Sequence, residues 1–135
     1  MTKQELRERM TQFAVQIIKM VDKMPQSISS VALAKQIIRS GTSPSANYRA
    51  ACLAKSDKDF VNKLKMVEEE LDETCHWLDL ILRSQIMPVS ILQPMVQEAN
   101  ELSNIISKSI VTMKTRMAAD DAEKINKSNK SINKS

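Results

Sequence analysis

Four segments of the chain carry apolar side chains at the spacing of an amphipathic helix. In the first, the apolar residues recur every three or four positions, at Leu6, Met10, Phe13, Ile17, Met20 and Met24. Thr2 and Glu5 have the spacing of a capping box, in which each side chain accepts a hydrogen bond from a backbone N–H that the helix leaves unpaired. Pro25 is expected to end this helix, because proline disfavours the helical conformation of the residue before it.

The second segment runs from about Ser27 to Lys55 and has an ambiguous middle. Residues 40–45 read Ser-Gly-Thr-Ser-Pro-Ser, a composition typical of a loop, and Pro44 lacks the N–H group that a helix needs. The pattern alone leaves two possibilities, one kinked helix or two shorter helices. The positions expected to face inward are Val31, Ala34, Ile38, Tyr48 and Ala51.

The third segment has the clearest repeat, with steps that alternate between four and three residues. Ser56, Asp57 and Asp59 precede or open it and provide oxygen atoms and negative charge for the positive end of the helix dipole. Its inward positions are Phe60, Leu64, Val67, Leu71, Thr74, Leu78 and Ile81.

The fourth segment follows Pro88, with Ser90 as the candidate capping residue. Its apolar positions are Leu92, Met95, Ala99, Leu102, Ile106, Met113 and Met117. The repeat stops near Ala119, and the sequence ends in the low-complexity run KINKSNKSINKS, which has too few apolar residues to fold alone. We therefore expect a flexible tail over residues 119–135.

The connections near Pro25, Ser56 and Pro88 are short, and short connections make neighbouring helices antiparallel. The sequence therefore predicts an all-α protein: one antiparallel up-down four-helix bundle over residues 1–118, followed by the tail. The composition agrees, because the 135 residues include one glycine, four prolines and only 3% aromatic residues, which disfavours a β fold.

The same composition predicts a cytoplasmic protein with no membrane partner. No apolar run approaches the roughly 20 residues that cross a bilayer, and the N-terminus is charged where a secretion signal would be apolar. Cys52 and Cys75 lie within helical patterns and are interpreted as small buried apolar residues in a reducing compartment.

Charge is strongly segregated along the chain. Residues 1–65 have twelve Lys or Arg and five Asp or Glu, residues 66–101 have one and eight, and residues 102–135 have seven and three. In the antiparallel bundle the basic stretches meet at one end, while the acidic residues lie along the third and fourth helices.

Two hypotheses fit this segregation. In the first, the basic end binds the phosphates of RNA or DNA, with little sequence selectivity and a strong dependence on salt. In the second, the charges pair with one another within the chain or between subunits of a structural or adaptor oligomer that binds no nucleic acid. The residues expected to contact phosphate are Arg7, Arg49, Lys55, Lys58, Lys63, Lys65, Lys114 and Arg116.

The sequence predicts no enzyme, no catalytic residues, no metal site and no cofactor. Glu73 and His76 have the Glu-x-x-His spacing of di-iron bundle proteins, but such a site needs two of these motifs and His76 is the only histidine. One histidine and one glycine also leave no credible catalytic triad and no glycine-rich phosphate loop. Trp77 is interpreted as half-buried packing, with a subunit interface as the alternative.

Residues 37–82 resemble the small four-helix-bundle proteins that are encoded by intervening sequences in bacterial 23S ribosomal RNA genes. That family includes the accessory variability determinant of diversity-generating retroelements. The resemblance covers about residues 4–85, and its matching positions are Phe13, Ala14, Ile17, Ile18, Pro25, Arg39, Ser40, Thr42, Ser43, Ala46, Asn47, Tyr48, Ser56, Asp59, Phe60, Lys63, Glu73, Thr74, Trp77 and Leu78.

The resemblance implies properties that the repeat does not. It implies that the second segment is one long helix, that the protein assembles as a homopentamer without catalytic activity, and that a reverse transcriptase is a possible partner. The sequence departs from the family pattern at Gly41 and Pro44, in the segment of small residues, and at His76, where an aromatic residue such as tyrosine is usual. The Lys/Asn/Ser-rich end is not a feature of the family.

Overall fold

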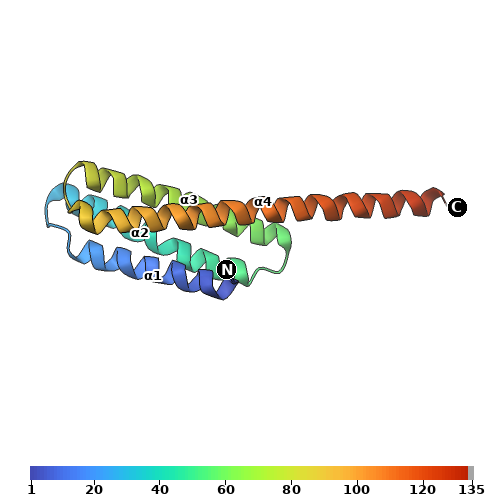
Figure 1. Ribbon diagram of the computed structural model, residues 1–135, viewed down its shortest axis with the longest axis horizontal. Coiled ribbons are helices and arrows are strands. Elements are labelled where there is room, and N and C mark those ends of the chain that lie inside the picture. The colour runs from blue at the N-terminus through green and yellow to red at the C-terminus, as the bar shows by residue number, and fades with distance from the viewer. Residues whose placement is uncertain (134–135) are drawn as a thin grey trace.

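The computed structural model describes residues 1–133 as four helices: α1 (Lys3–Asp22), α2 (Ile28–Cys52), α3 (Asp57–Arg83) and α4 (Val89–Asn133). Consecutive helices are antiparallel and joined by short turns, so the predicted up-down four-helix bundle is confirmed (Figure 1). The pairs α1–α2, α2–α3 and α3–α4 pack extensively, whereas α1 and α4 make few contacts. No helix in the described residues has an apolar stretch long enough to cross a membrane.

The helices begin where the capping residues predict, with one exception. Thr2 and Glu5 form the full capping box, and Ser27 and Ser56 accept hydrogen bonds from backbone N–H groups in the first turns of α2 and α3. The assignment of Ser90 as the cap of α4 is wrong. This helix starts at Val89, and the carbonyl of Pro88 accepts its first hydrogen bonds, from Ile91 and Leu92.

The predicted apolar repeats form the core. All six predicted positions of the first segment are buried, five of them in α1 and Met24 just after it, together with most of those in α3 and α4. Phe60, Met113 and Met117 are partly buried at the edge of the core. In α2 the expectation for Ile38 is wrong: its side chain is 36% exposed, and the neighbouring Ile37 is fully buried instead. Adjacent residues differ by about 100° around a helix, so only one of the two isoleucines faces inward.

The loop-like segment of α2 is part of one continuous helix, as the family resemblance implies and the repeat alone left open. Pro44 offers no N–H group to the carbonyl of Ser40. Just before Pro44, the hydroxyls of Thr42 and Ser43 donate to the carbonyls of Ile38 and Arg39, at 2.6 and 2.7 Å. Such hydroxyl-to-carbonyl bonds are compatible with helical backbone, so serine and threonine continue the helix here.

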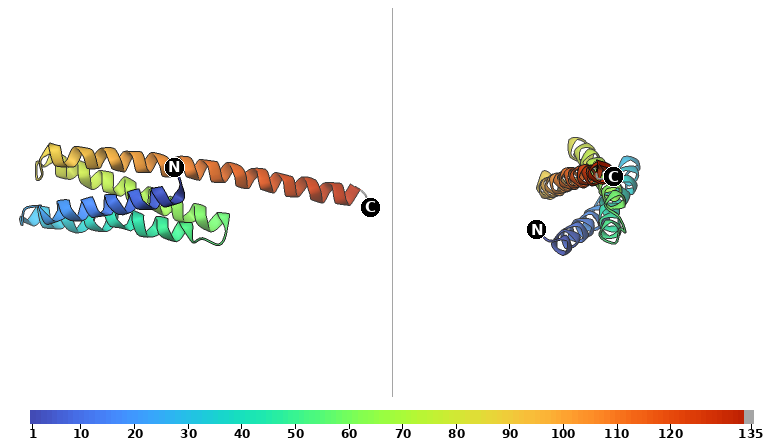
Figure 2. Two further views of the ribbon diagram at one scale, coloured as in Figure 1. Left: turned by 60° about the horizontal axis from the view of Figure 1, so that its bottom comes forward. Right: turned by 90° about the vertical axis from the view of Figure 1, so that its right-hand side faces the viewer.

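The flexible tail expected from residue 119 is not observed over the described residues. Instead α4 continues as a helix to Asn133 and projects far beyond the bundle (Figures 1 and 2). Residues 118–132 are all exposed, so this stretch adds nothing to the core. A helix that already has packed turns is not nucleated again, which favours its continuation. Residues 134 and 135 of the predicted tail lie outside the described residues.

Candidate nucleic-acid interface

The basic segments converge at one end of the bundle. The beginning of α1, the end of α2 and the beginning of α3 lie together there, and α4 passes them on its way out of the bundle (Figure 2). This end is the right-hand end of the bundle in Figure 1, and we call it the basic end. The convergence follows from the topology, because each short turn reverses the direction of the chain.

Two surface hollows show which of the predicted phosphate contacts lie close together. Arg7 of α1 and Arg49 of α2 line one hollow, of about 390 Å³. Lys55, between α2 and α3, and Arg116 of α4 line a second, of about 290 Å³. Four of the eight predicted residues therefore lie in two hollows, each shared by residues that are far apart in the sequence.

The other four predicted residues are more scattered. Lys58 and Lys65 are exposed on α3, and Lys114 is exposed on α4, but none of these three lines either hollow. The ammonium nitrogen of Lys63 lies 3.8 Å from a carboxylate oxygen of Asp59, one turn earlier on α3. Lys63 is therefore partly neutralised and is the weakest of the eight candidates.

The remaining cations of the predicted set have no carboxylate partner. Within residues 1–133, the seven predicted residues other than Lys63 make no ion pair. Positive charges that lack a partner repel one another, and a bound anion relieves that repulsion. The basic end therefore presents several cations without an ion-pair partner, although Asp57 lines the hollow of Lys55 and Arg116, and Glu5 and Glu8 line a hollow with Arg7.

Two further lysines belong to this surface. Lys3 lines the hollow with Lys55 and Arg116, and its ammonium nitrogen lies 4.6 Å from the centre of the Phe60 ring. Lys3 and Lys108 also line a third hollow, of about 400 Å³. The charge pattern assigned both lysines to the basic end but did not select them for phosphate contact. Lys3 lies one turn before Arg7 on α1, and residues four apart share a face of a helix. This spacing could have added Lys3 to the predicted phosphate contacts.

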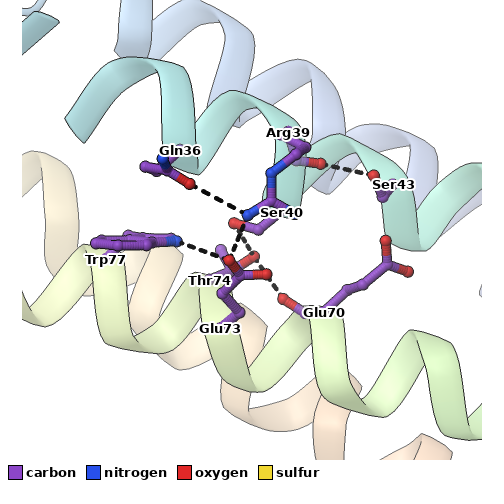
Figure 3. Close-up of polar contacts among 8 residues, drawn as sticks. All are labelled: Gln36, Arg39, Ser40, Ser43, Glu70, Glu73, Thr74 and Trp77. Atoms are coloured by element: carbon purple, nitrogen blue, oxygen red, sulfur yellow. Dashed lines mark hydrogen bonds and ion pairs between the residues drawn. The ribbon is translucent and has the colours of Figure 1, made fainter. Parts of the chain in front are cut away.

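Acidic residues of α3 and α4 form ion pairs with two arginines that are not among the predicted phosphate contacts. Arg9 of α1 pairs with Glu98 and Glu101 of α4, and the hydrogen bond to Glu98 raises the pKa of the guanidinium. Arg39 of α2 pairs with Glu73 of α3, and this hydrogen bond lowers the pKa of the carboxyl (Figure 3). These pairs join helices, and at the basic end α3 contributes two carboxylates, Asp59 beside Lys63 and Asp57 in the lining of the second hollow.

The Glu73–His76 spacing has a structural role. Besides Arg39, Glu73 accepts a 3.4 Å hydrogen bond from the indole nitrogen of Trp77, as Figure 3 shows. The exposed His76 ring lies beside that of Trp77, with 4.9 Å between their centroids. Trp77 is half-buried, as predicted. The carboxylate is therefore occupied by an arginine and a tryptophan.

The two cysteines are less buried than predicted. Cys52 and Cys75 are both free thiols of intermediate exposure. Burial raises the pKa of the Cys75 thiol, with a smaller effect in the same direction from Asp72. Burial likewise raises the pKa of Tyr48, which packs beside Cys52. Both shifts favour the protonated form.

Fold and surface together define a class of small antiparallel four-helix-bundle proteins with one basic end. The family model for 23S rRNA-intervening sequence proteins matches residues 2–108, and the chain belongs to this family. A comparison with curated proteins gave no significant match.

Among solved structures, the chain is similar to a protein of unknown function from the S23 ribosomal protein family of Bacteroides thetaiotaomicron. The two sequences are 30% identical, the match covers 82% of this chain and 98% of the other, and the TM-score is 0.76. The similarity agrees with the family assignment. Residues 109–135, which include the projecting part of α4, lie beyond the family match.

Proposed function

We propose that the protein is a non-enzymatic homo-oligomer that binds RNA or DNA through the basic end of its bundle. The observation that carries this proposal is that Arg7 and Arg49 line one surface hollow, that Lys55 and Arg116 line another together with Asp57, and that none of the four cations forms an ion pair within the described residues. The residues of each pair are far apart in the sequence, so the fold itself assembles the positive surface.

Binding of this kind is directed at the phosphate backbone. Arginine and lysine contacts to phosphate position a protein on nucleic acid but do not identify bases. The chain has few aromatic residues on which bases could stack. We therefore expect weak sequence selectivity and an affinity that falls steeply as salt rises, because each neutralised phosphate releases a counterion.

The assembly and the partner protein belong to the same proposal. The resemblance to the ribosomal-insertion and retroelement proteins supports a homopentamer in the cytoplasm. It also supports a role as an accessory adaptor to a reverse transcriptase, in which the bundle brings nucleic acid and polymerase together. A reverse-transcriptase gene beside the gene for this protein, with a template and variable repeat pair, would support the adaptor role.

The binding proposal is tested by filter binding of the full chain to labelled RNA and DNA duplexes over a range of salt concentrations. The variant Arg7→Gln/Arg49→Gln removes two charges from one hollow. Its slope of log affinity against log salt is expected to become shallower by about 1 to 2, because each phosphate contact on a DNA duplex contributes about 0.9.

The matched control is Lys19→Gln/Lys23→Gln, which removes two exposed charges at the opposite end of the bundle. This variant is expected to keep the slope of the unmodified protein. Equal slopes for the two variants would contradict a basic-end site. Absence of binding at low salt would favour the structural or adaptor oligomer that binds no nucleic acid.

A further inference from the structure

The C-terminal half of α4, including its projecting part, carries a second apolar stripe that the bundle does not use. Val111, Ala118, Ile125 and Ile132 follow one another at intervals of seven residues, and Val111 and Ile125 are 64% and 60% exposed. Thr115, Ala122 and Asn129 lie between them and complete a repeat of four and three. We call these seven positions the α4 seam. Its period of 3.5 residues is that of a left-handed coiled coil.

The α4 seam is distinct from the face of α4 that packs in the bundle. Met113 and Met117 lie in the same part of the helix and pack against the core. At 3.6 residues per turn, Val111 is turned roughly 160° from Met113, and Ala118 roughly 100° from Met117. The seam therefore faces away from the bundle, so another helix has access to it.

Charge is excluded from the α4 seam. None of its seven positions is charged, although residues 111–133 contain eight charged side chains. Lys114 and Asp121 flank the seam, and Glu123 and Lys127 form an ion pair of 3.3 Å along the outer face. The charged positions on the outer face are Arg116, Asp120, Glu123, Lys124, Lys127 and Lys130. Two copies of such a helix can meet through their seams without bringing like charges together.

We propose that residues 111–132 form a parallel coiled coil with the same residues of another copy of this chain. Residues 118–132 are all exposed, and a helical stretch without packing is marginally stable in water, so packing along a seam supplies the missing stabilisation. In the parallel arrangement Asn129 faces Asn129, where the two amides can hydrogen-bond, and a single buried asparagine is a common determinant of register.

The neutral seam and the common direction of the projecting helices in an oligomer both favour another copy of this chain as the partner. A seam with only neutral side chains has no charge pattern that would select an acidic or a basic partner helix. In a cyclic oligomer all projecting helices leave on one side, which places their seams in parallel. Isoleucine at the core positions 125 and 132 is compatible with more than two strands. The coiled coil does not depend on nucleic-acid binding.

Disulfide trapping of the full chain tests the proposal. In a Cys52→Ala/Cys75→Ala background, Ala118→Cys places a thiol on the seam and Asp120→Cys places one on the outer face of the same turn. Like seam positions face each other in a parallel coiled coil, so mild oxidation is expected to link chains through residue 118 and not through residue 120. Equal cross-linking at both positions, or none at either, would overturn the proposal.

A second pair of variants tests whether the seam drives the association. Ile125→Asp buries a charge in the coiled coil, and we expect it to slow cross-linking through residue 118 roughly tenfold. Ser131→Asp adds the same charge on the outer face and is expected to leave the rate unchanged. If both substitutions have the same effect, the coiled coil is ruled out. The experiment contains no nucleic acid, so its result is independent of the binding proposal.

Discussion

At the scale of single residues, Gly41 determines how closely α1 and α2 approach. A Cβ atom on Gly41 would lie 2.8 Å from Cγ1 and 3.0 Å from Cγ2 of Ile17, whose side chain is fully buried. Ile17 has little freedom to move, because it is β-branched and packed on all sides. The one glycine of the chain is therefore a packing residue, although its sequence neighbours suggested a loop.

We predict that Gly41→Ala destabilises the bundle by about 1 kcal/mol. Alanine gains about 1 kcal/mol in helix propensity, but forcing a methyl group into a packed core costs about 1–3 kcal/mol. In an Ile17→Ala background the space is free, so the same substitution is expected to become stabilising. Urea unfolding of the four proteins measures both effects, and the same sign in both backgrounds would contradict the packing role.

At the scale of elements, a buried hydroxyl pair joins α2 to α3. Ser40 and Thr74 are both fully buried, and their hydroxyl oxygens are 3.0 Å apart (Figure 3). The Thr74 hydroxyl is also 2.8 Å from the carbonyl oxygen of Glu70. Two turns farther along α2, Asn47 donates a 2.7 Å hydrogen bond to a carboxylate oxygen of Glu70. A polar contact within an apolar core favours one register of the two helices over others.

We predict that Thr74→Val lowers the free energy of unfolding by about 1–2 kcal/mol, because it leaves the Ser40 hydroxyl buried without its partner. The loss is expected to be smaller in a Ser40→Ala background. Thr11→Val is the control, since the Thr11 hydroxyl makes the same bond to a carbonyl one turn earlier but is exposed. Chemical denaturation measures the differences. A similar loss for Thr11→Val would argue against the buried pair.

The elements were also the part of the structure that the sequence predicted best. Burial repeats once per helical turn, so the apolar positions located all four helices. The repeat did not separate Ile37 from Ile38, because both are apolar and only packing decides which one faces inward. It did not predict the continuity of α2 either, because Ser-Gly-Thr-Ser-Pro-Ser has the composition of a loop, and only its surroundings in the bundle show that it is helical. The continuation of α4 was missed because its seam differs from the core repeat.

At the scale of the whole molecule, the topology made the basic end predictable. Short turns fix which helix ends meet, so a count of charges along the chain was enough to place them. The individual pairs were not predictable: Arg9 and Glu98 are 89 residues apart and meet only because α1 and α4 close the bundle. For the same reason the sequence did not show that Lys65 and Lys114 lie outside the two hollows.

The predicted homopentamer is testable on the purified protein by light scattering. A mass near five times the 15.2 kDa of one chain is expected, and the mass is expected to persist over a wide range of protein concentration. The measurement is best made without nucleic acid, so that binding does not add to the mass. A monomer at all concentrations would contradict both the pentamer and the coiled coil.

The projecting helix leaves the bundle at the basic end. The basic end is therefore not open on all sides, because the projecting part of α4 extends past it along one side. The first turn of the helix beyond the bundle carries Asp120 and Asp121, closely followed by Glu123, whereas Lys124, Lys127 and Lys130 lie farther out. A long polyanion that runs from the end of the bundle onto the projecting helix would be repelled by the three acidic side chains and attracted by the basic side chains before and after them. Such a molecule is expected to contact the arginines at the end of the bundle and the distal lysines of α4, and to make no contact with the acidic turn between them.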